Sequence, residues 1–492
     1  MKSHTVSIAR LLFLTAVISF FLTGNRGAAQ TKVDKIDRLM TLCYEYGQFN
    51  GTVLVAEHGK IIYKKGFGFA NMEWKIPNQP DTKFRLGSIT KQFTSMLILQ
   101  LVEQGKLKLD GKVTDYLPDY PKKNGDKITI HHLLTHTSGV PGYTEFPNFF
   151  RDRSRNPSTP QEFVKLFADS ALLFEPGTRF SYSNSGYFLL GVIIEKITGK
   201  PYEEVLQENI LTPLNMASTG YDQYGAILNK RAAGYEKDVL GFVNAPYLDM
   251  SLPYSAGALY SSVEDLYLWD QALYTEKLLP GKTKELLFNP YIPALGGGYG
   301  YGWVIAKVPL GHSNDSVMVI EHGGGINGFN TLISRIPSKR DLIVLLNNTG
   351  GTRLGQMSRA IRGILYDKPY DLPKRSIADS VHAAIQQRGL AAGLALYRDL
   401  KERHADTFEV LENELNIYGY RLLQAGKVKE AIEVFKLNVE AFPKSSNVYD
   451  SLGEAYMVNG DKELAIKNYQ KSVELNPRNV GGIEALKKLQ TK

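Results

Sequence analysis

The feature that most constrains the fold of this chain is an internal repeat near its C-terminus. Six positions recur 34 residues further along with the same or a similar side chain. Gly419, Gly426, Ala431, Ile432, Phe435 and Pro443 are matched by Gly453, Gly460, Ala465, Ile466, Tyr469 and Pro477. A constant offset indicates two copies of one structural unit, and strand-like alternation ends before this region. Each copy is therefore predicted to be a pair of helices, because small residues let two helices approach closely and aromatic residues fill the space between copies.

The second copy resembles the tetratricopeptide repeat, with tyrosine where that family often has tryptophan. The resemblance rests on the spacing of Tyr449, Leu452, Gly453, Tyr456, Ala465, Tyr469 and Pro477. Two clear repeats are few for a solenoid, so we expect segments 377–400 and 483–489 to serve as degenerate caps. The sequence thus predicts an all-α repeat domain over residues 376–492, and the resemblance implies that this domain binds a protein or peptide partner. A segment with two prolines, residues 367–375, is predicted to be the linker before it.

The chain before the linker has strand patterns at both ends and a helical middle. After a helical pattern at 34–46, the residues alternate at 51–57 and 60–66 around His58-Gly59, as in a hairpin. Strand patterns return at 316–321, 329–336 and 342–347, separated by the glycine-rich segment His322–Gly328 and a turn at 337–341. The middle begins with a long apolar-periodic stretch at 88–104. We therefore predict an α+β domain over residues 30–366, with a helical subdomain and with its terminal strands paired in one antiparallel sheet.

Composition and charge exclude several classes of protein. The 492 residues are 43% hydrophobic and 22% charged, which is typical of a folded globular protein. The formal net charge is +8, and the N-terminal segment, which lacks acidic residues, supplies three of these charges. The remaining basic residues are dispersed, so no nucleic-acid partner is expected. Cys43 is the single cysteine, which excludes an intrachain disulfide and any cysteine-based metal centre; we expect it to be a buried thiol in a helix.

The N-terminus is typical of a secretory signal. Lys2 and Arg10 precede the thirteen-residue apolar run Leu11–Thr23, and small residues at Gly27–Ala29 suit signal peptidase. The alternative is a retained membrane anchor, but this run is shorter than the ~20 residues that span a bilayer. We predict a cleaved signal over residues 1–29, a secreted or periplasmic protein, and no stable membrane span.

A serine and a lysine three residues apart stand at the start of the long helical stretch. Ser88 and Lys91 are expected on one helix face, about 5–6 Å apart between Cβ atoms. A serine hydroxyl needs a neighbour that accepts its proton, and a desolvated lysine has a lowered pKa and can do so. The amide of Ser88 would point outward, where it could stabilise a developing oxyanion. This spacing alone is weak evidence, because it also occurs by chance in an N-cap serine followed by a surface lysine.

Two further motifs complete a specific set. Tyr182-Ser183-Asn184 follows in the helical middle, and His322-Gly323-Gly324-Gly325 follows a predicted strand. Together the three motifs resemble the serine β-lactamase and penicillin-binding protein superfamily, in particular its class C-related branch of esterases and D-peptidases, in which the second motif is Tyr-x-Asn. Supporting segments of the same branch are Leu133–Gly139, Phe174–Gly177 and Ser255–Ser261. The resemblance covers roughly Asn50 to Asn348 and implies a β-lactamase-like fold.

The resemblance implies a role for each motif. Ser88 would be the acylated nucleophile, Lys91 its activating partner, and Tyr182 a general base and acid in the same proton relay. Asn184 would orient Lys91 and the substrate amide. The strand segment His322, Gly323 and Gly324 would form one wall of the substrate cleft, and the amide of Gly325 would complete an oxyanion hole with that of Ser88. No cofactor and no metal are expected, and the partner would be a small-molecule or peptide substrate.

One departure from the family pattern bears on the substrate. Many β-lactamases have Lys-Thr-Gly where this chain has His322-Gly323-Gly324. A histidine with an ordinary pKa near 6.5 replaces a permanent cation, so binding of penicillin-like acids should suffer. The sequence therefore predicts a serine hydrolase that acts through an acyl-enzyme on an ester, a D-amino-acid peptide or a β-lactam amide. The alternative is a catalytically inactive peptidoglycan- or peptide-binding protein with a repeat domain for interactions.

Two other candidates are weaker. His132 and His136 have the spacing of a zinc helix, but Leu133 stands where that motif requires glutamate. The segment Gly296–Trp303 is rich in glycine but lacks the Lys-Ser/Thr of a phosphate-binding loop. We expect it to be a mobile aromatic rim of the cleft.

Overall fold

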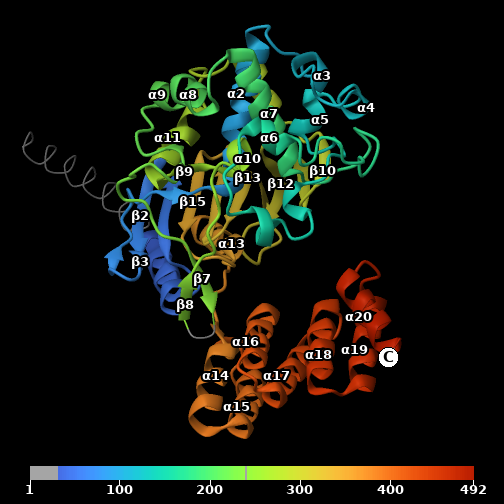
Figure 1. The fold of residues 1–492 in the computed structure, drawn as a ribbon. Helices are drawn as coiled ribbons and strands as arrows, with labels where there is room; N and C mark the ends of the chain where they lie inside the picture. Colours follow the sequence, from blue (N-terminus) through green and yellow to red (C-terminus); the bar gives the residue numbers. More distant parts are fainter. Residues whose placement is uncertain (1–30, 239–240, 492) are drawn as a thin grey trace, which may run out of the picture. The chain divides into compact units, whose positions relative to one another are not determined.

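The strands predicted at the two ends of the first region form one antiparallel sheet. In this computed structural model, which describes residues 31–238 and 241–491, β1 (Gly51–Glu57) lies between β2 (Lys60–Phe67) and β15 (Asp341–Asn347). The eight-stranded sheet has the order β10-β11-β12-β13-β14-β15-β1-β2 (Figure 1). Its other strands are β10 (Ile292–Ala294), β11 (Gly297–Tyr299), β12 (Val304–Pro309), β13 (Ser316–Ile326) and β14 (Phe329–Ile336). The predicted α+β class and the pairing of the terminal strands are confirmed.

Alternating residues of the central strands enter two separate cores. Val53 and Val55 pack on one face against the helix at 31–45 and against α13 (Leu354–Leu365), whereas Leu54 and Ala56 join the larger core on the other face. This period of two explains why β1 is buried on both sides. Cys43 is buried in the smaller core and forms no disulfide, as expected.

The helical subdomain covers the larger core, and Figure 1 shows its helices gathered on one side of the sheet. The longest are α2 (Thr90–Glu103), α7 (Asn184–Thr198) and α11 (Val263–Ala272). Shorter ones are α3 (Val113–Tyr116), α4 (Lys122–Gly125), α5 (Ile130–Leu134), α6 (Pro160–Val164), α8 (Tyr202–Leu206), α9 (Thr212–Leu214), α10 (Tyr254–Gly257) and α12 (Gly281–Glu285). A small sheet of β5 (Phe84–Arg85), β9 (Leu259–Ser261) and β6 (Gly220–Tyr221) leads into α2.

Three local expectations need correction. Ser88 lies in a 3-10 turn, η1 (Gly87–Ile89), and the α-helix begins only at Thr90. The segment predicted to separate two strands continues β13 as far as Ile326, because its glycines pair in register with β14. Tyr299 and Trp303 are fully buried, so the segment Gly296–Trp303 is part of the packed sheet and not a mobile rim.

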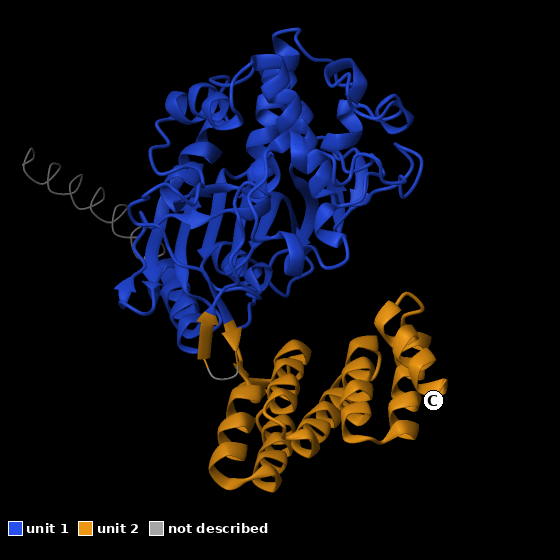
Figure 2. Ribbon diagram, viewed as in Figure 1, with its two compact units in different colours: residues 1–236, 244–372 blue, residues 237–243, 373–492 orange. Residues whose placement is uncertain are grey.

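The chain divides into two units, shown in Figure 2. The first comprises the described residues up to Glu236 together with Asn244–Leu372, and the second comprises Lys237–Val243 and the chain from Pro373 onwards. The boundary at Leu372 falls within the predicted linker, 367–375. The predicted signal segment, 1–29, lies outside the described residues. Across residues 31–238 and 241–491, none of the helices has the combined length and apolar character needed to cross a membrane.

The second unit is helical, as the repeat predicted. Its helices are α14 (Ile377–Arg388), α15 (Leu390–Arg403), α16 (Glu412–Gln424), α17 (Val428–Ala441), α18 (Ser446–Asn459), α19 (Lys462–Leu475) and α20 (Val480–Gln490). A Cβ on Gly419 would lie 2.4 Å from the ring of Phe435, and a Cβ on Gly453 would lie 3.2 Å from the ring of Tyr469. These recurring glycine–aromatic pairs are thus contact points between the two helices of each pair.

A short segment from the middle of the chain also belongs to the second unit. β7 (Tyr235–Asp238) and β8 (Gly241–Asn244) form a two-stranded sheet, and Lys237 and Asp238 of β7 and Gly241–Val243 of β8 are grouped with the helices. Lys237 Nζ lies 2.8 Å from Glu414 Oε1, and Arg421 forms an ion pair with Asp238. No pattern in the sequence indicated this association.

Candidate active site

Ser88 is held in place by the tight packing of its turn against β13. Gly87 has a φ of +56°, and a Cβ there would lie 2.9 Å from both the amide nitrogen and the carbonyl oxygen of Gly325. Only glycine adopts this conformation at so close an approach without strain. The turn and the end of β13 therefore bring the backbone amides of Ser88 and Gly325 to the same place.

Lys91 is fully buried and makes three polar contacts. Its Nζ lies 3.0 Å from Ser88 Oγ, 2.8 Å from Asn184 Oδ1 and 2.8 Å from the carbonyl oxygen of Ala256. Burial lowers the pKa of Lys91 well below its usual range. In the neutral amine, two N–H groups donate to Asn184 and Ala256, which only accept in these contacts. The lone pair is then left to face the hydroxyl of Ser88, which is the arrangement that a base requires.

Asn184 is the first residue of α7, and the capping of that helix fixes its direction. The Ser183 side chain accepts a hydrogen bond from the amide of Gly186 at 3.3 Å. Asn184 Nδ2 donates to Thr144 Oγ1 at 3.3 Å, so its oxygen is turned toward Lys91. Asn184 and Lys91 are thus in direct contact.

Tyr182 lies beside the same lysine. Lys91 Nζ is 4.9 Å from the centre of the Tyr182 ring. Burial raises the pKa of the Tyr182 phenol above its usual value, and a hydrogen bond with Ser88 acts in the opposite direction. The phenol is therefore protonated near neutral pH and is available as a proton donor.

Behind Tyr182 runs a chain of hydrogen bonds that the sequence did not reveal. The amide of Ser183 donates to His136 Nδ1 at 3.0 Å, and His136 Nε2 lies 3.1 Å from the Tyr299 hydroxyl. That hydroxyl lies 3.0 Å from His322 Nε2, and His322 Nδ1 lies 2.6 Å from the carbonyl oxygen of Gly323. Because an amide only donates and a carbonyl only accepts, the proton positions follow: His136 donates to Tyr299, which donates to His322.

The imidazoles of His136 and His322 are both neutral near pH 7. Burial lowers the pKa of His322 to about 4 and that of His136 well below its usual range, and the nearby Lys91 acts in the same direction on both. No pattern in the sequence predicts the contact between His136 and Tyr299. Both residues lie in segments that the sequence singles out, Leu133–Gly139 and Gly296–Trp303. Their contact, however, arises only in the tertiary fold.

The glycines after His322 allow β13 to pack closely on the serine turn. A Cβ on Gly324 would lie 1.9 Å from the carbonyl oxygen of Leu86 and 2.3 Å from Thr331 Oγ1. A side chain at this position would force the turn away from the strand. Gly324 thus packs against the serine turn, and Gly325 is the residue of this strand segment that reaches the cavity at Ser88.

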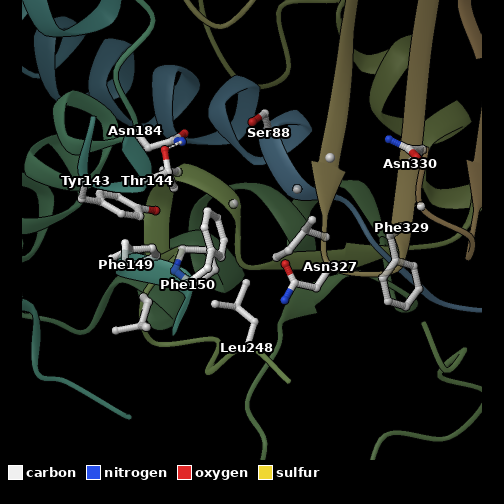
Figure 3. Close-up of a pocket in the computed structure, with 18 of the residues that line it drawn as sticks. Ser88, Tyr143, Thr144, Phe149, Phe150, Asn184, Leu248, Asn327, Phe329 and Asn330 are labelled. Carbon is white, nitrogen blue, oxygen red and sulfur yellow. Dashed lines mark hydrogen bonds between the residues drawn. The ribbon is translucent and has the colours of Figure 1, made fainter. Parts of the chain in front are cut away.

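A cavity of about 340 Å³ opens at Ser88. Figure 3 shows Tyr143, Phe149 and Phe150 on one side of it and Phe329 and Asn330 on the other. Of the predicted site residues, Ser88, Asn184 and Gly325 line this cavity. His322 lies outside the lining, with both ring nitrogens already engaged.

Comparisons with known proteins agree with this geometry. The Beta-lactamase family model matches residues 34–365, and the Tetratricopeptide repeat model matches residues 446–479. Penicillin-binding protein 4* of Bacillus subtilis (strain 168) is 35% identical over 379 residues, which cover 72% of this chain and 81% of that protein.

Two solved structures are similar over most of their length. The octameric penicillin-binding protein homologue from Pyrococcus abyssi is 30% identical, with a TM-score of 0.62, over 72% of this chain and 82% of that one. The D-amino acid amidase from Ochrobactrum anthropi SV3 is 25% identical, with a TM-score of 0.58, over 70% of this chain and 98% of that one. The chain therefore belongs to the β-lactamase family of serine hydrolases, within the group related to penicillin-binding proteins, and it carries a C-terminal tetratricopeptide repeat.

Proposed function

We propose that this protein is a serine hydrolase that forms an acyl-enzyme on Ser88. The observation that carries the proposal is the placement of Ser88 Oγ 3.0 Å from the amine of a buried lysine whose pKa is lowered by burial. A lysine in this state can take a proton at neutral pH, and Ser88, whose hydroxyl lies beside it, lines the cavity.

In the proposed reaction, Lys91 and Tyr182 transfer the protons and two backbone amides stabilise the oxyanion. Lys91 takes the hydroxyl proton as Ser88 Oγ bonds to the substrate carbonyl carbon, and the amides of Ser88 and Gly325 donate to the resulting oxyanion. As the bond to the leaving group breaks, Tyr182 gives its phenolic proton to that group and recovers a proton from Lys91. Water then cleaves the acyl-enzyme by the reverse sequence of proton transfers. Asn184 holds Lys91 in line throughout.

The same geometry favours esters and D-amino-acid amides or peptides over β-lactams. A penicillin-like carboxylate needs a cation or a free donor, and His322 is neutral with both nitrogens engaged within the protein. Among the described residues that line the cavity there is no lysine, arginine or histidine. We therefore assign His322 to holding Tyr299 and the cleft wall, and not to binding the carboxylate. The similarity to a D-amino acid amidase supports the same substrate range.

A hydrolysis screen tests this proposal. Wild-type protein and Ser88→Ala are assayed with p-nitrophenyl esters, D-alanyl peptides and nitrocefin. We expect wild type to hydrolyse an ester or a D-peptide at least about tenfold faster than nitrocefin, since one lost charged contact costs roughly that factor. Faster turnover of nitrocefin would contradict the substrate assignment. Lack of any Ser88-dependent turnover would instead favour an inactive peptidoglycan- or peptide-binding protein.

We also propose that the protein is exported and that its repeats bind a protein or peptide. The export signal rests on residues 1–29 of the sequence and the interaction role on the repeat match at 446–479. N-terminal sequencing of protein recovered from the periplasm or medium should begin at Gln30. A mature protein that still starts at Met1 would contradict cleavage.

A further inference from the structure

The cavity at Ser88 is apolar over most of its surface. Four aromatic residues from three elements, Tyr143, Phe149, Phe150 and Phe329, line it together with Leu248 (Figure 3). A volume of about 340 Å³ accommodates an aromatic or branched side chain next to the reacting carbonyl. Apolar burial alone would therefore select a hydrophobic group in the substrate.

One charged side chain interrupts this apolar lining. Glu236, on β7, is the single ionisable acid or base, apart from Tyr143, among the described residues that line the cavity. Its Oε1 accepts a hydrogen bond from the amide of Gly328 at 2.9 Å. The carboxylate also packs over Gly350, where a Cβ would lie 1.8 Å from Oε2. The position of Glu236 is thus fixed by backbone on two sides.

Glu236 has no positively charged partner. Within the described part of the chain, no lysine or arginine forms an ion pair with it, and its neighbour Lys237 is paired with Glu414. Oε2 accepts no hydrogen bond from the described residues. When a ligand fills the cavity, this carboxylate loses water, and that loss is unfavourable unless the ligand supplies a cation.

We infer that Glu236 binds the ammonium group of the substrate, so that the site takes amino-acid esters, amides or peptides with a free amine beside an aromatic or branched side chain. This inference rests on the proposed serine hydrolase function and narrows its substrate class. A cation next to aromatic rings and a fixed carboxylate is stabilised by both. A carboxylate substituent in the same place would be repelled, in agreement with the low expected activity on β-lactams.

The test compares matched substrates that differ only in the amine. Phenylalanine p-nitrophenyl ester, as both enantiomers, is compared with the 3-phenylpropanoyl ester, which has hydrogen in place of the amine. In Glu236→Gln the amide oxygen can still accept from Gly328, so the variant removes the charge and keeps the local hydrogen bond. Glu285→Gln, an exposed glutamate outside the cavity, makes the same change of charge.

The measured quantity is the ratio of kcat/KM for the amine substrate to that for the neutral one. We expect wild type to prefer the amine in at least one enantiomer, the ratio to fall about tenfold or more in Glu236→Gln, and Glu285→Gln to match wild type. A fall of less than fivefold in Glu236→Gln, or a wild-type preference for the neutral ester, overturns the inference. If neither ester is hydrolysed by wild type, the proposed function itself fails and the inference falls with it.

A second measurement needs no variant. Phenethylamine and the matched neutral alcohol 2-phenylethanol are compared as protectants of wild-type Ser88 against a fluorophosphonate probe. The amine should protect at a concentration about tenfold lower. Equal protection by the two compounds would show that Glu236 does not select a cation, while labelling of Ser88 would still stand as evidence for the hydrolase.

Discussion

At the scale of single residues, the proposed mechanism depends on the buried amine of Lys91, which lies 3.0 Å from Ser88 Oγ. Ser88, Lys91, Tyr182 and Asn184 were identified because each lies within a short motif. Lys91 contacts Asn184 and Ala256, which lie far from it along the chain, and its burial among them lowers its pKa, as the proposed role of a base requires. Tyr299 was not recognised, because its partners come from two other segments and no local pattern reports such a contact.

Lys91 and Tyr182 should act as one unit. Lys91→Ala and Tyr182→Phe each interrupt the same proton relay, so each is expected to lower kcat by at least about a hundredfold. The double variant should be little worse than the more damaging single variant. Steady-state kinetics on one ester substrate checks this. A double variant whose loss equals the product of the single losses would mean that the two residues act independently.

His322 should make the stability of the first unit depend on pH. Its pKa is lowered in the fold to about 4, so its contribution is fully present above its ordinary pKa and is lost as pH falls toward 4. Between about pH 7.5 and pH 5 this histidine alone should remove about 2 kcal/mol from the free energy of unfolding, and the lowered pKa of His136 adds in the same direction.

Tryptophan fluorescence during urea unfolding measures the free energy of unfolding of the first unit, because Trp74, Trp269 and Trp303 all belong to it. His322→Gln should show a smaller loss of stability on acidification than wild type. His404→Gln, at an exposed histidine of the second unit, is the matched control. An equal pH dependence in wild type and His322→Gln would contradict a neutral buried His322.

At the scale of elements, periodicity predicted most of the fold, and it failed at the glycines of β13. The hairpin of β1 and β2 and the pairing with β15 follow from alternating apolar residues. The strand pattern ends at residue 321, and glycine, which is frequent in the segment that follows, is disfavoured in strands. Pairing of Gly323, Gly324 and Gly325 with β14 outweighs that preference, and the same glycines make room for the serine turn.

Gly324→Ala should therefore damage the site through the backbone. The added Cβ would lie 1.9 Å from the carbonyl oxygen of Leu86, so strand and turn must separate. We expect a loss of stability of at least about 1–3 kcal/mol and a fall in kcat/KM of at least about tenfold. Gly355→Ala, in α13 with open space around it, should leave both values near wild type. Unchanged activity in Gly324→Ala would show that the close packing is not needed.

At the scale of the whole molecule, the sequence pattern separates two regions along the chain but gives no sign that part of the first region belongs to the second unit. The family model ends at residue 365, and the second unit resumes at Pro373. Lys237 and Asp238 of β7 and Gly241–Val243 of β8 belong to the second unit although they lie within the first along the chain. Lys237 and Asp238 form ion pairs with Glu414 and Arg421, which lie far away in the sequence, and no sequence motif indicates such pairs.

Removal of residues 373–492 should leave a folded, active hydrolase. The proposed catalytic residues and the cavity lining all belong to the first unit. The truncation removes Glu414 and Arg421, the ion-pair partners of Lys237 and Asp238, and we expect its effect mainly at these two residues. Tryptophan fluorescence and ester hydrolysis measure folding and activity of the truncated protein. Insoluble or inactive protein would show that the repeats are required for the hydrolase.

The central claim is that Ser88 becomes covalently acylated. Wild type and Ser88→Ala are incubated with a fluorophosphonate, and intact mass spectrometry is followed by peptide mapping. The account predicts one adduct per wild-type chain, located on Ser88, and none on Ser88→Ala. An unmodified wild-type protein, or an equal adduct on Ser88→Ala, would contradict it.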